Sequence, residues 1–237
     1  MKAKVLLSWS SGKDSAWTLH VLRQHPDVEI VGLLTTINSH FQRVAMHGTR
    51  YELLKMQAAA ARLPLWEIPL PWPCSNEVYE QAMAAACTSA VQEGISAIAF
   101  GDLFLEDVRR YREDRLRGTG LDPLFPLWNR NTRELIFEMI DGGLQARMVC
   151  VDPAKMPADF AGRDLDHKLI ERLPESVDPC GENGEFHTFA YGGPMFREPI
   201  PIETGECVTR DGFVFADVLL QPHVRLGQAV SGAPQSR

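Results

Sequence analysis

Short apolar runs alternate along the first two thirds of the chain with longer segments whose apolar positions recur at helical spacing. The apolar runs predict strands at 5–7, 28–37, 65–70, 95–101 and 145–151. The segments between them predict helices from 13, at 49–63, 75–93, 106–117 and 132–141. Apolar strands that alternate with helices are typical of a parallel sheet covered on both faces. We therefore expect an α/β fold with a parallel five-stranded sheet, which binds its ligands at the carboxyl ends of the strands.

The pattern changes after Asp152, where the chain becomes rich in Pro and Gly. Two strand-like runs follow, at 186–191 and 214–220. We expect residues 1–151 to form the α/β domain and residues 152–225 a smaller α+β subdomain that binds substrate. Residues 226–237 are expected to be a flexible tail.

Composition narrows the class of protein. The 237 residues carry a formal net charge of −7 and include five cysteines, without a Cys-x-x-Cys pair. The net negative charge of the chain does not indicate a nucleic-acid partner. We see neither a signal-peptide pattern nor an apolar run near the roughly 20 residues of a membrane span. We expect a cytoplasmic protein whose cysteine thiols are mostly buried or take no part in its chemistry. We expect neither nucleic acid nor a membrane among its partners.

The first chemically distinctive stretch is Ser10-Ser-Gly-Lys-Asp-Ser15, which links the first strand to the first helix. Small residues at a helix N-terminus leave backbone N–H groups that converge on one spot, and the helix dipole favours an anion there. Lys13 adds a full positive charge. The stretch is not a Walker A loop, because Asp14 follows Gly12-Lys13 and Leu7 stands where the first glycine belongs. It predicts a phosphate-binding loop of another kind, the alternative being an ordinary Ser-capped helix.

The second distinctive stretch is Asp178-Pro-Cys-Gly-Glu-Asn-Gly-Glu-Phe-His-Thr188. It gathers carboxylates, an amide, a histidine and a threonine in a segment that enters a predicted strand. If that strand is regular, Glu185 and His187 share one face while Phe186 and Thr188 take the other. The sequence equally allows a polar hairpin turn at Asn183-Gly184.

Together these stretches resemble the diphthine–ammonia ligase family of PP-loop, or N-type, ATP pyrophosphatases. The loop is similar to the family's Ser-Gly-Gly-x-Asp-Ser, with Ser11 in place of the first glycine. The other matching pieces are Met46-His-Gly48, Asp107 with Arg110 and Arg112, Leu121 to Trp128, and Gly181 to Thr188. The resemblance covers the chain to about residue 220. It implies a Rossmann-like fold of the adenine nucleotide alpha-hydrolase (HUP) type, and ATP and Mg²⁺ as cofactors. It also implies activation of a carboxylate with release of AMP and pyrophosphate, followed by amidation with ammonia.

One departure concerns the acceptor. The founding members of the family carry Glu-Gly-Gly-Glu-Tyr-Glu, whereas this chain has Glu182-Asn-Gly-Glu-Phe-His187. Because an imidazole replaces an anion, we expect an acceptor other than diphthine. We expect this acceptor to be a carboxylate on a small molecule or on a protein side chain. The sequence also allows the chain to form a homodimer.

Roles for the candidate residues follow from this chemistry. Lys13, Asp14, Glu182, Glu185 and His187 are the predicted catalytic residues. Predicted ATP contacts come from the loop and from strand ends: Ser8, Ser10, Ser11, Gly12, Lys13, Asp14, Ser15, Thr35, Thr36, Met46, Gly101 and Asp102. Predicted acceptor contacts are Arg110, Arg112, Asn183, Glu185 and His187. Asp14 is the predicted Mg²⁺ ligand.

Three alternatives remain open from the sequence. An adenylating enzyme of cobalamin salvage shares the loop chemistry. A tRNA-modifying PP-loop enzyme needs an RNA-binding appendage, and the thiolating members need paired cysteines, which the chain lacks. A non-catalytic ATP-binding module would not need the second motif.

Overall fold

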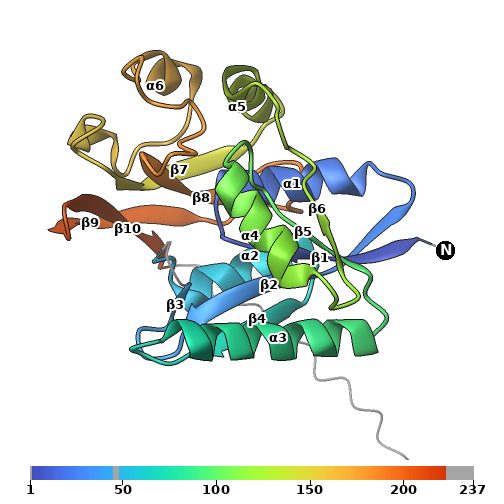
Figure 1. Cartoon of the computed structure of the whole chain (residues 1–237). Helices are drawn as coiled ribbons and strands as arrows, with labels where there is room; N and C mark the ends of the chain where they lie inside the picture. The colour runs from blue at the N-terminus through green and yellow to red at the C-terminus, as the bar shows by residue number, and fades with distance from the viewer. Residues whose placement is uncertain (1, 45–47, 223–237) are drawn as a thin grey trace, which may run out of the picture.

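The computed structural model describes residues 2–44 and 48–222, and two sheets organise them (Figure 1). The first sheet has a parallel core of β1 (Ala3–Ser8), β2 (Val28–Asn38), β4 (Leu65–Leu70), β5 (Ala97–Ala99) and β6 (Asp122–Leu124). Its strand order is β3-β2-β1-β5-β6, with β4 paired to β2, and the short β3 (Arg43–Val44) is antiparallel to β2. The expected parallel sheet is confirmed.

The second sheet is antiparallel, with the order β8-β7-β10-β9. Its strands are β7 (Gln145–Val151), β8 (Phe186–Gly192), β9 (Ile202–Arg210) and β10 (Phe213–Leu220). The run at 145–151 is thus a strand, as predicted, but its assignment to the parallel sheet was wrong. The fifth parallel strand is β6, which pairs with β5. The domain boundary at residue 151 remains a prediction, and the expected tail at 226–237 lies outside the described residues.

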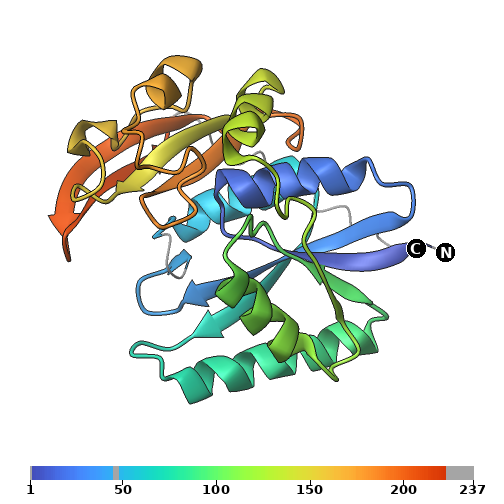
Figure 2. The same ribbon diagram turned by 45° about the horizontal axis from the view of Figure 1, so that its top comes forward.

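Helices cover both faces of the first sheet (Figure 2). α1 (Lys13–Arg23) and α2 (Tyr51–Ala61) lie between the two sheets, whereas α3 (Asn76–Gln92) and α4 (Glu106–Leu116) lie on the other face. α5 (Thr132–Asp141), the 3₁₀ turn η1 (Ala158–Phe160) and α6 (His167–Glu171) accompany the second sheet. As predicted, Ser75 caps α3, because its hydroxyl accepts a hydrogen bond from the Val78 N–H at 3.3 Å.

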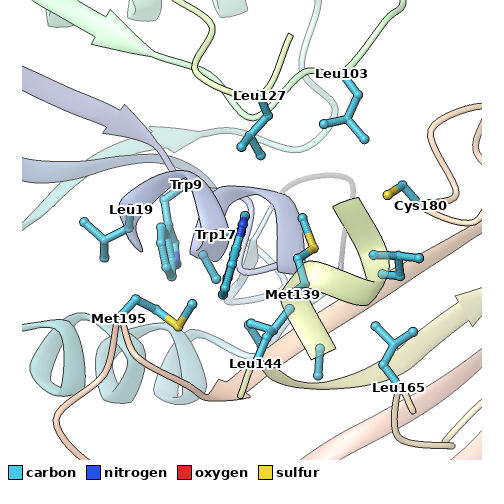
Figure 3. Close-up of a cluster of buried hydrophobic side chains, with 14 of the residues drawn as sticks. Trp9, Trp17, Leu19, Leu103, Leu127, Met139, Leu144, Leu165, Cys180 and Met195 are labelled. Atoms are coloured by element: carbon cyan, nitrogen blue, oxygen red, sulfur yellow. The ribbon is translucent and has the colours of Figure 1, made fainter. Parts of the chain in front are cut away.

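The alternation of side chains along β1 explains this layering. Val5 and Leu7 point into the core between the sheets, whereas Leu6 points into the core under α3, and all three are fully buried. Figure 3 shows the core between the sheets, where Trp9 and Trp17 lie near Met139 and Met195. One continuous core therefore fixes the second sheet against α1, the helix that begins at the phosphate-binding loop.

No helix in the described ranges is long and apolar enough to cross a membrane.

Candidate active site

The loop between β1 and α1 has the backbone of an anion-binding turn. Ser11 has a φ of 72°, in the left-handed region that favours glycine. This explains why the motif that the loop resembles carries glycine there. Gly12 is the N-cap of α1, so the first N–H groups of the helix open toward the space in front of the loop.

A buried glutamine holds the loop from behind. The Gln57 side chain donates to the Ser11 carbonyl at 2.9 Å and to the Ala190 carbonyl at 2.6 Å, and it accepts from the Trp9 ring N–H at 2.9 Å. Gln57 is fully buried. Every polar group of this amide is satisfied, so it fixes the loop, α2 and β8 relative to one another.

The start of β8 lies directly on the loop. The Lys13 N–H donates to the Thr188 hydroxyl at 3.0 Å, and the Ala190 N–H donates to the Ser11 carbonyl at 2.9 Å. A Cβ on Gly12 would lie 3.2 Å from the Thr188 carbonyl oxygen. Only glycine permits so close an approach without a shift of one backbone.

Lys13 connects the two motifs. Its ammonium donates to both carboxylate oxygens of Asp14, at 3.0 and 2.7 Å, and to the carbonyl of Cys180. Lys13 is 3% exposed. Burial is the largest single influence and opposes the charge of Lys13, but Asp14, Cys180 and Glu182 together raise its pKa above the ordinary value. The lysine therefore stays cationic between the loop and the second motif.

The second motif is a turn held by its own carboxylates. Asp178 accepts from the N–H groups of Cys180 at 3.2 Å and of Glu182 at 3.0 Å. Glu185 in turn accepts, through one oxygen, from the Asp178 N–H at 3.1 Å and from the Asn183 side chain at 3.1 Å. Its other oxygen is buried and has no partner in the described residues.

A polar cavity of about 200 Å³ lies where the two motifs meet. The predicted site residues that line it are Ser8, Ser10, Gly12, Lys13, Asp14, Ser15, Gly101, Asp102, Arg112, Glu182 and His187. The second motif therefore borders the phosphate-binding loop. Four lining residues belong to the matched motif but had no predicted role there: Gly181, Gly184, Phe186 and Thr188. Cys180 lies in the second distinctive stretch outside the matched motif, and Phe100 was not singled out at all.

Other predicted site residues lie outside this lining. Ser11 and Glu185 are buried behind it, Arg110 and Asn183 are exposed, and Thr35 and Thr36 lie farther along β2. The Thr35 hydroxyl is buried without a partner in the described residues. Met46 lies outside the described residues. The predicted roles of these residues remain predictions.

The predicted alternation of side chains holds within β8. Phe186 and Ala190 join the core between the sheets, whereas Phe189 joins the separate cluster with Val149 and Val218. Glu185 precedes β8, which begins at Phe186, so the two-residue period does not extend to it.

Glu182 and His187, which also line the cavity, have shifted pKa values. Burial raises the pKa of Glu182 to about 7, even though the Leu103 N–H donates to its carboxylate at 2.8 Å. Burial, together with the charge of Lys13, lowers the pKa of His187. At neutral pH the site therefore holds a neutral imidazole beside a carboxyl group near the midpoint of its titration.

Arg112 is the second cation in the lining. It donates to Asp102 at 3.2 Å, and its guanidinium stacks 4.7 Å from the centre of the Phe100 ring. The arginine is thereby fixed at the end of β5. The Cys180 thiol is held neutral, since burial raises its pKa, and it donates to the Thr132 carbonyl at 3.3 Å. A neutral thiol of this kind is a poor nucleophile.

The oxygen ligands of the lining suit Mg²⁺. Asp14, Asp102 and Glu182 supply carboxylates, and hard cations prefer oxygen ligands. No cluster of three or more His, Cys, Asp or Glu suited to a metal occurs within 2–44 and 48–222. Mg²⁺ is commonly bound by one or two carboxylates together with substrate phosphates and water, so the lining fits this ion.

Known proteins match this chain over both sheets. The family model described as "Diphthamide synthase C-terminal domain" matches residues 131–217. The human protein named diphthine–ammonia ligase is 33% identical, over 96% of this chain and 94% of its own length. The rat protein of the same name is 32% identical, over 95% of this chain and 93% of its own length. The bovine protein of that name is 28% identical, over 88% of this chain and 86% of its own length.

Proposed function

Since this chain belongs to the diphthine–ammonia ligase family, we propose that it is an ATP-dependent ligase that activates a carboxylate for amidation. ATP is split into AMP and pyrophosphate, and the acceptor carboxylate receives the adenylyl group. Ammonia then attacks the acyl carbon, AMP leaves and the amide forms. The observation that carries this proposal is the single cavity in which Lys13 and Asp14 face Glu182 and His187.

The first step demands that charge be stabilised on the phosphates. Attack of a carboxylate on the α-phosphate moves negative charge onto the departing pyrophosphate. The N–H groups at the start of α1, the Ser10 and Ser15 hydroxyls and the Lys13 ammonium are proposed to bind the phosphates. Asp14 is the proposed ligand of Mg²⁺, which supplies additional positive charge when it is bound.

The second step demands that a proton be removed. Ammonia loses one proton when it becomes an amide nitrogen, and Glu182 is the proposed base, because its pKa of about 7 suits proton transfer near neutral pH. Arg112 is proposed to bind the acceptor. His187 stands where the founding members carry an acid, so we propose that it selects an acceptor of this branch. The expected cytoplasmic location remains part of this proposal.

The reaction products test the proposal. We expect ATP to give AMP and pyrophosphate in equal amounts when ammonium and an acceptor carboxylate are present, and product chromatography measures this ratio. Elongation factor bearing diphthine is the first acceptor to try, because the relatives are named for diphthine. Formation of ADP and phosphate instead would contradict the pyrophosphatase chemistry, whichever acceptor is used.

The pH profile tests the role of Glu182. Because a base acts when it is deprotonated, we expect the amide-forming rate to rise as pH increases through about 7. The rate must be measured at a constant concentration of unprotonated ammonia, which itself depends on pH. Glu182→Gln should lower the rate and remove this limb. His187 cannot supply the limb, because its pKa is shifted downward; an unchanged limb in Glu182→Gln would rule out Glu182 as the base.

A further inference from the structure

Gln57 lies at a position of α2 where the helix pattern predicts an apolar side chain. The buried face of α2 carries Leu53, Leu54, Ala58 and Ala61 at helical spacing, and Gln57 is on that same face. A polar side chain in such a place costs free energy unless its groups are paired, whereas an apolar side chain carries no such cost. The presence of an amide here therefore indicates a role other than packing.

The three partners of Gln57 fix which way its amide faces. The Trp9 ring N–H can only donate, so it must meet the side-chain oxygen of Gln57, at 2.9 Å. The carbonyls of Ser11 and Ala190 can only accept, so both must meet the side-chain nitrogen, at 2.9 and 2.6 Å. Gln57 thus donates two hydrogen bonds, which a carboxyl group of the same size could not do.

The bond from Gln57 to Ser11 determines where the next N–H points. The Ser11 carbonyl also accepts from the Ala190 N–H at 2.9 Å, so two donors occupy its two lone pairs. In a trans peptide the C=O and the N–H point in opposite directions. The Gly12 N–H is therefore directed away from Gln57, and it donates to the Ser10 hydroxyl at 3.3 Å. Both Ser10 and Gly12 line the active-site cavity.

The Gly12 N–H is a suitable donor for a phosphate. Its bond to the Ser10 hydroxyl is longer than usual at 3.3 Å, and hydrogen bonds to an ionised oxygen are shorter and stronger. A phosphate oxygen in the cavity would therefore replace the hydroxyl. The opposite orientation of the peptide would direct the Ser11 carbonyl oxygen at the phosphates, and its partial negative charge would repel them. The orientation of this one peptide thus matters for phosphate binding.

We propose that Gln57 is a positioning residue for the cleavage of ATP: by holding the Ser11 carbonyl, it keeps the Gly12 N–H directed at the departing pyrophosphate. Its second donated hydrogen bond, to Ala190, joins the same peptide to β8, the strand that carries His187 into the cavity. Gln57 does not line the cavity and acts only through the backbone of the loop. This role rests on the proposed function, because it requires the loop to bind the phosphates of ATP.

Binding of inorganic pyrophosphate to the full chain tests this role without turnover. The chain has only two Ser–Gly pairs, Ser11-Gly12 and Ser231-Gly232. Cell-free synthesis with ¹³C at the serine carbonyl and ¹⁵N in glycine therefore leaves two signals in an NMR spectrum selective for bonded pairs of the two labels. Ser231→Ala removes one of them and so assigns the Gly12 amide. We expect the Gly12 amide proton to move downfield when pyrophosphate binds, because its hydrogen bond becomes stronger.

Three variants separate the hydrogen bonds of this amide. Gln57→Met keeps most of the side-chain volume but donates nothing, so it should weaken pyrophosphate binding about tenfold and reduce the shift of the Gly12 amide. Gln57→Glu keeps the bond to Trp9 but donates at most one hydrogen bond, so it should weaken binding too, and it serves if Gln57→Met does not fold. Trp9→Phe removes only the ring N–H partner, so binding should stay within about threefold of wild type.

A stability control separates positioning from folding. Ile95 is buried in the core under α3 and lies outside the lining of the active-site cavity. Ile95→Ala should therefore lower the melting temperature without changing pyrophosphate affinity or the Gly12 signal. If folded Gln57 variants bind pyrophosphate as the wild type does, with the same Gly12 shift, Gln57 has no positioning role, although the proposed function stands. If the wild-type chain binds no pyrophosphate, the loop has no phosphate-binding role and both proposals fail.

Discussion

Replacement of Lys13 by methionine is expected to reduce kcat/KM for acceptor adenylation about 100-fold to 1,000-fold, the usual cost of removing one group that stabilises charge in a transition state. Methionine keeps much of the length of the side chain but removes its charge. In the described lining of the active-site cavity, Arg112 is the other permanent cation, and it already pairs with Asp102. A fixed pair of this kind cannot take over the position of Lys13 between Asp14 and the Cys180 carbonyl.

Stability must be measured alongside activity, because Lys13 is only 3% exposed. Because the ammonium of Lys13 is buried, its removal is expected to lower the stability of the fold. Removing one partner of a buried ion pair costs about 3–5 kcal/mol, but water reaches Asp14, whose side chain is 26% exposed, and reduces this cost.

The matched control for Lys13→Met is Lys55→Met. Lys55 is exposed on α2 and contacts the Tyr51 ring, so its loss should change neither kcat/KM nor the melting temperature appreciably. The double variant Lys13→Met/Asp14→Asn restores the charge balance and should recover stability but not activity. A folded Lys13→Met chain with kcat/KM within fivefold of wild type would show that this ammonium does not act on the phosphates.

The strands and helices of this chain could be predicted well where they bury a periodic face. The predicted strand bounds 65–70 and 145–151 and the helix 132–141 agree with the structure. β6 was missed because it contains Pro123, which argues against a strand. Proline is tolerated there because β6 is the last strand on its side of the first sheet. β9 was missed because most of its residues are exposed and polar, as on an edge strand.

Local pattern identifies a strand but not its neighbours, which is why β7 was placed in the wrong sheet. The pairing of β7 with β8 joins residues far apart in the sequence, such as Val151 and Phe186, which are 35 positions apart. Contacts of this kind depend on the packing of the whole core.

The active site was predictable to the extent that its chemistry lies in side chains. The loop and the second motif were identified from residue types and do meet in one cavity. The role of the Cys180 carbonyl, which accepts a hydrogen bond from Lys13, could not be predicted from the sequence. Every residue has a carbonyl group, and its direction depends on the path of the backbone. Glu185 was expected beside the acceptor for its carboxylate, but the turn directs that carboxylate toward Asp178.

Replacement of Glu185 by alanine is therefore expected to reduce kcat at least 100-fold through loss of positioning, while the affinity for ATP changes less than twofold. One Glu185 oxygen accepts from the Asp178 N–H and from the Asn183 side chain, and Asp178 in turn holds the N–H groups of Cys180 and Glu182. Without this acceptor, both the Cys180 carbonyl and the Glu182 carboxylate lose their fixed places. A misplacement of about 1 Å can cost 100-fold in rate.

The conservative variant decides how Glu185 acts. Glu185→Gln keeps an oxygen for both donors, and the oxygen that it replaces has no partner in the part of the chain that the structure describes. If Glu185 only positions the turn, Glu185→Gln should recover most of the activity that Glu185→Ala loses. The rising limb of the pH profile should then stay at about 7, because Glu182 keeps its surroundings. If Glu185 instead acts through its charge on the acceptor or on ammonia, Glu185→Gln should be as inactive as Glu185→Ala, with ATP binding intact in both. Equilibrium binding of ATP, kcat and the pH profile, measured on the two variants side by side, separate these outcomes because only a positioning role predicts that glutamine restores activity.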